Sequence, residues 1–217
     1  MDKKFILLVT FAIILGISVF VSAVQKEMNF PGTTTTADFT EQSFKFVKGW
    51  NLVQGVMNPE WIQKNSNYIK AIFIFNPKTK EYVRFYPNPE NNKIGETNYR
   101  WEHFATIGAT WVYSEKEFTS NYWKFEDFPL DSTYLFAGWN FVGITSKITG
   151  KSIDNIKGDC SIEKVFFWSA PANKWFEFSF SEIIDREYTG TGLVLKVSSD
   201  CNLGTSKDIT APPAIPN

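Results

Sequence analysis

The chain contains few of the side chains on which enzymes and metal sites depend. Among its 217 residues are one histidine and two cysteines. A nucleophilic triad would have to use His103 as its base, but the sequence has no Gly-x-Ser-x-Gly, His-Glu-x-x-His or phosphate-loop motif. We therefore expect no catalytic residue, no metal and no cofactor. Carboxylate pairs such as Glu182 and Asp185 leave an exported glycoside hydrolase as a less favoured alternative.

The chain also lacks an excess of charge of either sign. Its 22 basic and 23 acidic residues leave a formal net charge of −1, and no run of lysines and arginines is present. Nucleic acid is therefore not an expected partner. The residues in excess are aromatic, at 17% of the chain with 21 phenylalanines. Flat rings pack well on pleated sheets, so this bias favours a mainly β fold.

One long apolar run stands at the N-terminus. Lys3 and Lys4 precede an apolar stretch from residue 5 to residue 24, which as a helix would be roughly 30 Å long and would cross a bilayer. The lysines would stay in the cytoplasm (N-in) and the rest would be exported (C-out). We expect residues 1–24 to be a retained signal anchor, which the length favours, with a signal peptide cleaved near Ala23 as the alternative. Both interpretations place the remainder outside the cytoplasm.

Two further segments lack hydrophobic periodicity. Residues 25–42 contain Pro31, Gly32 and four consecutive threonines, and we expect a threonine-rich tether there. Residues 205–217 contain three prolines and are expected to form a disordered tail.

Between tether and tail, one unit is repeated. Gly49-Trp50-Asn51 recurs as Gly138-Trp139-Asn140, each time followed by helix-start signals and then by a hairpin pattern, residues 72–85 and 165–178. The closing strands align as residues 108–113 and 190–195, with a register uncertain by one residue. We predict two tandem repeat modules, 43–125 and 126–204, each with several antiparallel strands and one short helix. With the N-terminal hydrophobic helix, the fold class is mainly β (β-rich α+β).

The recurring residues are interpreted as architecture. Glycine would bend the strand, tryptophan would fill the core of the unit, and asparagine would hydrogen-bond to the backbone at the bend. Aromatic residues at other matched positions are also expected to pack: Phe75, Tyr82, Trp168 and Trp175. The remaining aromatic residues form a candidate ligand platform: Trp61, Trp101, Trp111, Tyr113 and Trp123. The polar segment 87–100 is expected to be a surface loop, where function tends to reside.

The order Gly-Trp-Asn-Leu-Val, short helix, apolar strand and Gly-rich strand resembles a repeat in exported surface proteins of archaea and little-cultured bacteria. The closing strand of that repeat reads Gly-x-Gly-Tyr-Trp-Val and is often followed by a cysteine. Trp111-Val112 matches part of it in the first copy. In the second copy Gly190-Thr191-Gly192 and Cys201 match other parts, and Leu193-Val194 replaces the aromatic pair. The resemblance covers residues 43–204 and implies a cell-surface module without a particular activity.

Both cysteines, Cys160 and Cys201, fall in the second module, and their counterparts in the first lie near Asn67 and Phe118. Absence of both from the first module is what a mutually bonded pair would produce. Outside the cytoplasm we expect a disulfide. The alternative, a two-thiol metal site, would need further ligands.

Together these features predict a non-catalytic, extracytoplasmic cell-surface protein, structural or adhesive, that displays two β-rich modules on a membrane anchor. The first alternative is a carbohydrate-binding module that uses an aromatic platform. The expected partners are the membrane, through residues 5–24 if the segment is uncleaved, and a surface glycan or another surface protein.

Overall fold

The computed structural model describes residues 23–27, 36–55, 59–91, 93, 108–125, 130 and 133–204, with only the backbone described for 23–27, 36–40 and 123–125. The N-terminal hydrophobic helix expected from the sequence lies outside these ranges, apart from its last two residues, and so does the expected tail. Within the described ranges, no helix is both long and apolar enough to cross a membrane.

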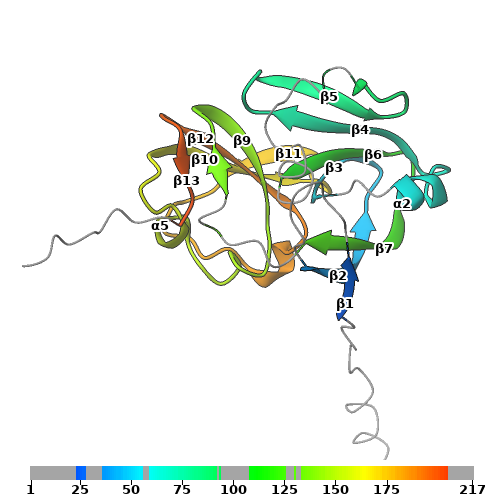
Figure 1. Cartoon of the computed structure of the whole chain (residues 1–217), viewed down its shortest axis with the longest axis horizontal. Helices are drawn as coiled ribbons and strands as arrows, with labels where there is room; N and C mark the ends of the chain where they lie inside the picture. Colours follow the sequence, from blue (N-terminus) through cyan, green and yellow to red (C-terminus); the bar gives the residue numbers. More distant parts are fainter. Residues whose placement is uncertain are drawn as a thin grey trace, which may run out of the picture.

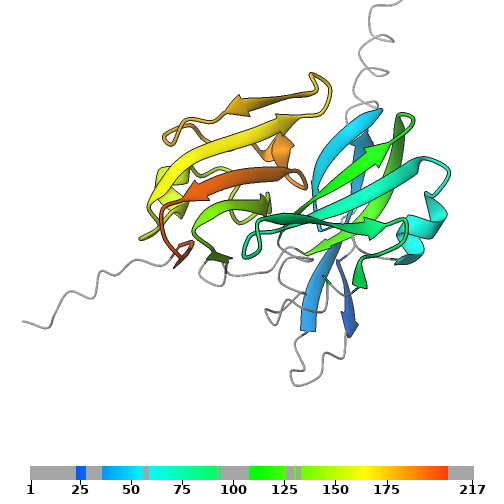
Figure 2. The same cartoon turned by 90° about the horizontal axis from the view of Figure 1, so that it is seen from above.

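The fold is mainly β with several antiparallel sheets, as the composition predicts. The first large sheet has the order β3-β6-β4-β5 and consists of β3 (Gly49–Gln54), β4 (Ile69–Asn76), β5 (Glu81–Tyr86) and β6 (Ala109–Ser114). The second has the order β9-β12-β10-β11 and consists of β9 (Gly138–Gly143), β10 (Ile162–Ser169), β11 (Lys174–Glu177) and β12 (Gly192–Val197). In each sheet, the strand that comes last in the sequence lies between the first and the second: β6 lies between β3 and β4, and β12 between β9 and β10 (Figures 1 and 2).

A short helix connects the first and second strand of each large sheet. Helix α2 (Pro59–Lys64) begins with proline and has Glu60 in its first turn, which complements the helix dipole. Helix α5 (Ile153–Ile156) has Ser152 as its N-cap residue. The Ser152 hydroxyl accepts from the backbone N–H of Asn155, and the Asn155 side chain accepts from the backbone N–H of Ser152.

Two smaller antiparallel sheets accompany the large ones. The first consists of β1 (Ala23–Glu27), β2 (Thr36–Phe46) and β7 (Phe118–Phe125), and the second of β8 (Tyr134–Leu135) and β13 (Cys201–Asn202). Phe46 lies opposite Phe118, and Leu135 opposite Cys201. The second small sheet is therefore a shortened counterpart of the β2–β7 pair. A 3-10 turn, Arg186–Tyr188, precedes β12.

The tether expected at residues 25–42 is not a plain spacer, because Thr36–Phe46 forms β2 and pairs along its length with β7. A backbone ladder needs no hydrophobic alternation, which is why the periodicity of the sequence did not reveal this strand. The first of the small sheets therefore extends into a segment that the sequence analysis had left outside both modules.

Each large sheet covers a core with one of its faces. The first core is buried between the first sheet, helix α2 and the β2–β7 pair, and includes Phe46, Val53, Trp61, Ile62, Ile69, Ile72, Val112 and Tyr122. The second core has the same position under the second sheet and includes Leu135, Val142, Ile153, Ile156, Cys160, Val165, Leu193, Leu195 and Val197. The sheet residues named here point into these cores, so the opposite faces of the sheets remain for other contacts.

The two large sheets meet through those opposite faces. Leu52, Ala109 and Val194 are buried between them, with Trp111, Phe141 and Trp168 packed around. A β-carbon on Gly192 would clash with that of Ala109, so only glycine allows this approach. Residues of the first half also hold the segment before β12, since the Tyr122 hydroxyl and the Gln54 backbone N–H both donate to the Gly190 carbonyl, at 3.0 and 2.8 Å.

Two isolated bridges join the sheets, Val53 to Thr191 and Gly108 to Val142. In the paired strands Val53 occupies the position of Val142, and Gly108 that of Thr191. The two bridges thus connect matched positions in exchanged order. This is the arrangement that an approximate two-fold axis between the sheets produces.

The Gly-Trp-Asn segments adopt the same geometry in both sheets. Gly49 and Gly138 have φ values of 103° and 101°, which favour glycine. The Asn51 amide accepts from the Val47 N–H at 3.0 Å and donates to the carbonyls of Val47 and Gly49 at 2.9 and 3.1 Å. Asn140 makes the same three hydrogen bonds to Phe136 and Gly138. The expected roles of glycine and asparagine are confirmed.

The expected role of tryptophan in this segment is wrong. Trp139 is 36% exposed and Trp50 is half-buried, and neither belongs to the cores under the sheets. In a strand successive side chains point to opposite faces, so the buried Asn51 and Asn140 send their neighbouring tryptophans to the far side. That side is where the two sheets face each other.

Candidate functional site: two aromatic clefts between the sheets

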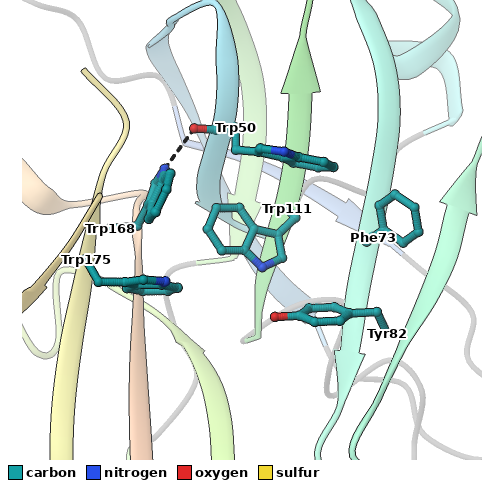
Figure 3. A pocket seen from close by; sticks show the side chains of 6 residues that line it. All are labelled: Trp50, Phe73, Tyr82, Trp111, Trp168 and Trp175. Carbon is teal, nitrogen blue, oxygen red and sulfur yellow. Dashed lines mark hydrogen bonds between the residues drawn. The ribbon is translucent and has the colours of Figure 1, made fainter. Parts of the chain in front are cut away.

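An open cleft of about 380 Å³ lies between the two large sheets (Figure 3). Its lining is aromatic throughout and comes from both sheets: Trp50, Phe73, Tyr82 and Trp111 from the first, Trp168 and Trp175 from the second. We call this the first cleft. Four of its six lining residues are tryptophans, the side chains with the largest aromatic surface.

Trp111 is the centre of the first cleft. Its ring makes edge-to-face contacts with three other indoles, those of Trp50 at 6.0 Å, Trp168 at 5.2 Å and Trp175 at 5.6 Å between centroids. In Figure 3 Trp111 lies in the middle, with Trp50 on one side and Trp175 and Tyr82 on the other. Such perpendicular pairs are favoured by the ring quadrupoles, so the aromatic residues hold one another in place.

One hydrogen bond at the first cleft links the two large sheets. The Trp168 indole N–H donates to the backbone carbonyl of Trp50 at 2.8 Å (Figure 3). The indoles of Trp50, Trp111 and Trp175 donate to no residue of the described ranges, which leaves three N–H groups at the cleft. None of the six lining side chains is charged at neutral pH. The cleft therefore combines apolar ring faces with a few neutral donors.

A second cleft, of about 340 Å³, lies next to the first. It is lined by Phe75, Tyr82, Trp139, Phe141, Phe166, Trp175 and Val194. Tyr82 and Trp175 line both clefts, so their rings form the ridge that separates them.

The second cleft is the two-fold counterpart of the first. Strand registers match Trp50 with Trp139 and Phe73 with Phe166, and they match Trp111 with Val194. The facing pairs Phe75–Tyr82 and Trp168–Trp175 also correspond. Applied to all six residues of the first cleft, this correspondence returns the lining of the second, which gains only Phe141.

The two clefts differ in their polar groups. At the position of Trp111 the second cleft has Val194, and at that of Trp168 it has Phe75. Both replacements remove an indole N–H and reduce the aromatic area. Trp139 and Trp175 are the remaining tryptophans in the second cleft. The first cleft is therefore the better equipped of the two for a ligand with both apolar faces and hydroxyl groups.

The alternation of two kinds of apolar residue explains why the clefts are aromatic. In β4 the side chains of Ile72 and Ile74 are buried, at 0 and 6% exposed, and those of Phe73 and Phe75 point the other way. The aliphatic side faces the core and the aromatic side faces the second sheet. Rings on opposing twisted sheets do not fill the space between them, and the clefts are what remains.

The structure separates the residues that the sequence proposed as a ligand platform. Trp111 lines the first cleft, and Tyr113 contacts Trp50 at its edge, 5.0 Å between centroids. Trp61 is buried in the first core, 6% exposed, and donates to the Ser120 hydroxyl at 3.1 Å. Trp101, His103 and the side chain of Trp123 lie outside the described part of the chain.

Several residues expected to pack in the module cores line the clefts instead, as Trp50 and Trp139 do. Tyr82 is 48% and Trp175 39% exposed, and Trp168 is half-buried between the sheets. The sequence analysis did not single out Phe73, Phe141, Phe166 or Val194. The available signal was the strict alternation of aliphatic and aromatic residues from Ile72 to Phe75 in β4, which marks a face distinct from the core.

The perturbed ionisable groups lie away from the clefts. Backbone donation from Arg84 lowers the pKa of Glu90, and donation from the Ala137 N–H and the Tyr134 hydroxyl lowers that of Asp200. Burial raises the pKa of Tyr188. Asp185, one of the candidate hydrolase carboxylates, accepts from the Glu187 N–H and caps the 3-10 turn. Within the described ranges, no three His, Cys, Asp or Glu side chains gather as metal ligands.

The fold and the site together define a β protein with a pair of open, neutral, aromatic clefts at the junction of two matching sheets. Comparison of the chain with family models, with curated proteins and with solved structures found no match. The resemblance to surface repeats stays a prediction, and function is argued from the clefts.

Proposed function

We propose that this protein is a non-catalytic, extracytoplasmic surface protein that binds glycans in the first cleft. The observation that carries the proposal is the constellation of four tryptophans around an open space, with three indole N–H groups free of partners among the described residues. The adhesive role expected from the sequence and the carbohydrate-binding alternative are then one function.

The chemistry of the lining matches that of a sugar. A pyranose ring has apolar C–H faces, which stack on indole and phenol rings, and a rim of hydroxyl groups, which accept from indole N–H donors. The lining of the first cleft has no ionised group, which favours a neutral ligand over an acidic or basic one. Its volume lies in the range of small-ligand sites.

The same lining argues for binding without turnover. Glycoside hydrolysis needs two carboxyl groups on either side of the scissile bond. The side chains around both clefts are aromatic or aliphatic, and Tyr82 is the single residue among them that could exchange a proton.

Two features support a location outside the cytoplasm. The Cys160–Cys201 disulfide is of a kind that persists in oxidising compartments. The apolar run at residues 5–24 has the length of a single span, which would anchor the protein with its C-terminus outside, or would be removed near Ala23 as a signal peptide.

The proposal includes the origin of the two halves as tandem repeat modules with one short helix each. Equal strand order, equal Gly-Trp-Asn hydrogen bonds and matched registers support a duplication. In this account, the second module was added face to face with the first, and the ligand site arose between them.

The test is glycan binding by the full chain in detergent, first on an array of neutral and charged glycans and then by calorimetry. Trp175→Ala should lower affinity about tenfold, because it removes a stacking surface that lines both clefts, and a tenfold loss corresponds to about 1.4 kcal/mol. Phe176→Ala is the matched control, since Phe176 is the next residue of β11 and equally exposed at 39% but lines neither cleft.

Far-ultraviolet circular dichroism and thermal unfolding verify that both variants fold. Binding that is absent from every glycan tested, or equally strong in Trp175→Ala and the parent, would refute a glycan site in the first cleft. Release of shorter sugars from a bound glycan would instead identify an enzyme.

A further inference from the structure

We propose that the two clefts are successive subsites for one linear glycan, which crosses the ridge formed by Tyr82 and Trp175. This inference rests on the proposed function and specifies its ligand: a neutral, linear oligosaccharide long enough to span both clefts. Glycans confined to one cleft would bind more weakly.

The shared ridge is the first argument. Tyr82 and Trp175 line both clefts and are well exposed, at 48 and 39%. Their neighbours carry the aromatic surface on in either direction, with Trp111 5.6 Å from Trp175 on one side and Phe141 6.0 Å from Tyr82 on the other. A ligand that leaves the first cleft over this ridge therefore stays on aromatic surface, and none of the residues that line the two clefts is charged.

The approximate two-fold axis is the second argument. A glycan chain has a direction, so two identical subsites related by a two-fold axis would present themselves to it in opposite senses. One chain cannot satisfy both with the same set of hydrogen bonds. The lining differs in the way this constraint requires: the second cleft has Val194 and Phe75 where the first has Trp111 and Trp168. It retains stacking surfaces and the indoles of Trp139 and Trp175, and it lacks the indole donor of Trp111, since the Trp168 N–H of the first cleft is already bonded to Trp50.

The first cleft is therefore the subsite that orients the ligand, and the second adds stacking that tolerates either direction. Burial of apolar C–H groups against aromatic rings is less directional than a hydrogen bond, which needs an aligned donor and acceptor. Because both subsites bind one molecule, the second contact is intramolecular and its contribution appears as a gain in affinity with chain length.

The experiment is calorimetry of the full chain in detergent with cello- and manno-oligosaccharides, from the disaccharide to the octasaccharide, together with the longest array glycan that binds. Affinity should rise with length and then level off, with a total gain of about tenfold or more. Trp139→Ala should abolish this gain and lower the affinity for long oligosaccharides far more than that for the disaccharide, because Trp139 lines the second cleft and not the first.

Trp50→Ala is the matched variant, since Trp50 has the same place in the first cleft and the same glycine and asparagine neighbours. It should weaken binding at every length. Indole ¹⁵N–¹H spectra provide a measurement on the unaltered protein: the Trp139 resonance should shift with long oligosaccharides and stay in place with the disaccharide.

The outcomes separate the two proposals. Binding that is independent of length, with Trp139→Ala and the Trp139 resonance unaffected, would overturn the two-subsite inference and leave the proposed function intact. Loss of binding at all lengths in Trp139→Ala, with a normal melting temperature, would also contradict it. A chain that binds none of the sugars fails both.

Discussion

The two halves of the molecule share the same strand order and the same Gly-Trp-Asn bends, which we call the frame. They differ in the contacts that hold their small sheets against the cores. In the second half, Cys201 of β13 forms a disulfide with Cys160, with 5.4 Å between Cα atoms. In the first half, Phe118 occupies the position of Cys201, and its ring stacks on Phe46 at 4.7 Å and on Tyr68 at 4.9 Å. A covalent link and a stack of three rings thus hold equivalent strands against the core.

A second fastening differs in the same way. Lys45 and Glu117 form an exposed ion pair at 2.8 Å in the first half. At the matching positions of the second half, the Tyr134 hydroxyl donates to the Asp200 carboxylate, also at 2.8 Å. The carboxylate and the distance are retained, and the donor has changed from an ammonium group to a phenol hydroxyl. Both halves therefore link the two strands at this point, one by an ion pair and the other by a hydrogen bond from a neutral hydroxyl.

The invariant part is the bend at Gly-Trp-Asn, where both halves use the same residues and the same hydrogen bonds. Backbone geometry allows few solutions at this point, because the glycine φ is positive and the asparagine must satisfy backbone groups four residues away. The comparison therefore separates the bend, which the fold requires in both halves, from the contacts that hold the small sheets, which differ between the halves.

Removal of the disulfide should produce the largest difference between the halves. The double substitution Cys160→Ala with Cys201→Ala should lower the free energy of unfolding by about 4 kcal/mol, because the bond closes a loop with a sequence separation of 41. Urea unfolding of the parent protein, the reduced parent and the double variant measures it.

Phe118→Ala is the corresponding variant in the first half and should lower the free energy of unfolding by about 2–3 kcal/mol, since the ring is partly buried and loses two stacking partners. The difference between the two losses compares the covalent and the aromatic fastening. Equal free energies of unfolding for the parent and the cysteine variant would mean that the disulfide adds no stability beyond that of the packed core.

An effect smaller than that of the disulfide, and equal in the two halves, is expected at the bends. Asn51→Ala and Asn140→Ala each remove the three hydrogen bonds that the two buried side chains have in common, and each should lower the free energy of unfolding by about 2–3 kcal/mol. Thermal and urea unfolding measure both variants. Values that differ by more than about 1 kcal/mol would contradict the view that the frame is the common part of the two halves.

Much of this frame could be predicted from the sequence, because it rests on local rules. Glycine and asparagine at the bend, Ser152 at the start of α5 and the cysteine pair each have a short-range or chemical signature. The strand at Thr36–Phe46 could not be recognised in the same way, because its pairing with β7 depends on residues far along the chain.

The clefts were not predictable because they depend on a register and on a choice of faces. Alignment of the closing strands matched Trp111 with Leu193, whereas the paired strands match it with Val194. A slip of one residue moves a side chain to the other face of a strand. Leu193 lies in the second core, and Val194 lies between the sheets. The repetition of aromatic residues in the two modules identified side chains that pack, but it did not show that they pack against the other sheet and not in the core of their own module.

The smallest effect is expected at the Tyr134–Asp200 pair. Donation from the Ala137 N–H and the Tyr134 hydroxyl lowers the pKa of Asp200 below its usual value of 3.8, so the ionised carboxylate stabilises the folded state. That contribution is fully present above the unfolded-state pKa and is lost as pH falls through the folded-state pKa. Asp200→Asn should therefore flatten the acid limb of a plot of melting temperature against pH.

Because Asp200 is exposed, the change at neutral pH should stay below about 2 °C. Salt separates this pair from its counterpart. The Lys45–Glu117 ion pair is screened by added salt, so Lys45→Met should cost less at 1 M than at 0.05 M sodium chloride. The loss in Asp200→Asn should change less with salt, since its partners are neutral dipoles at hydrogen-bond distance. Equal salt sensitivity at both positions would indicate that general charge effects, and not these two contacts, fasten the strand ends.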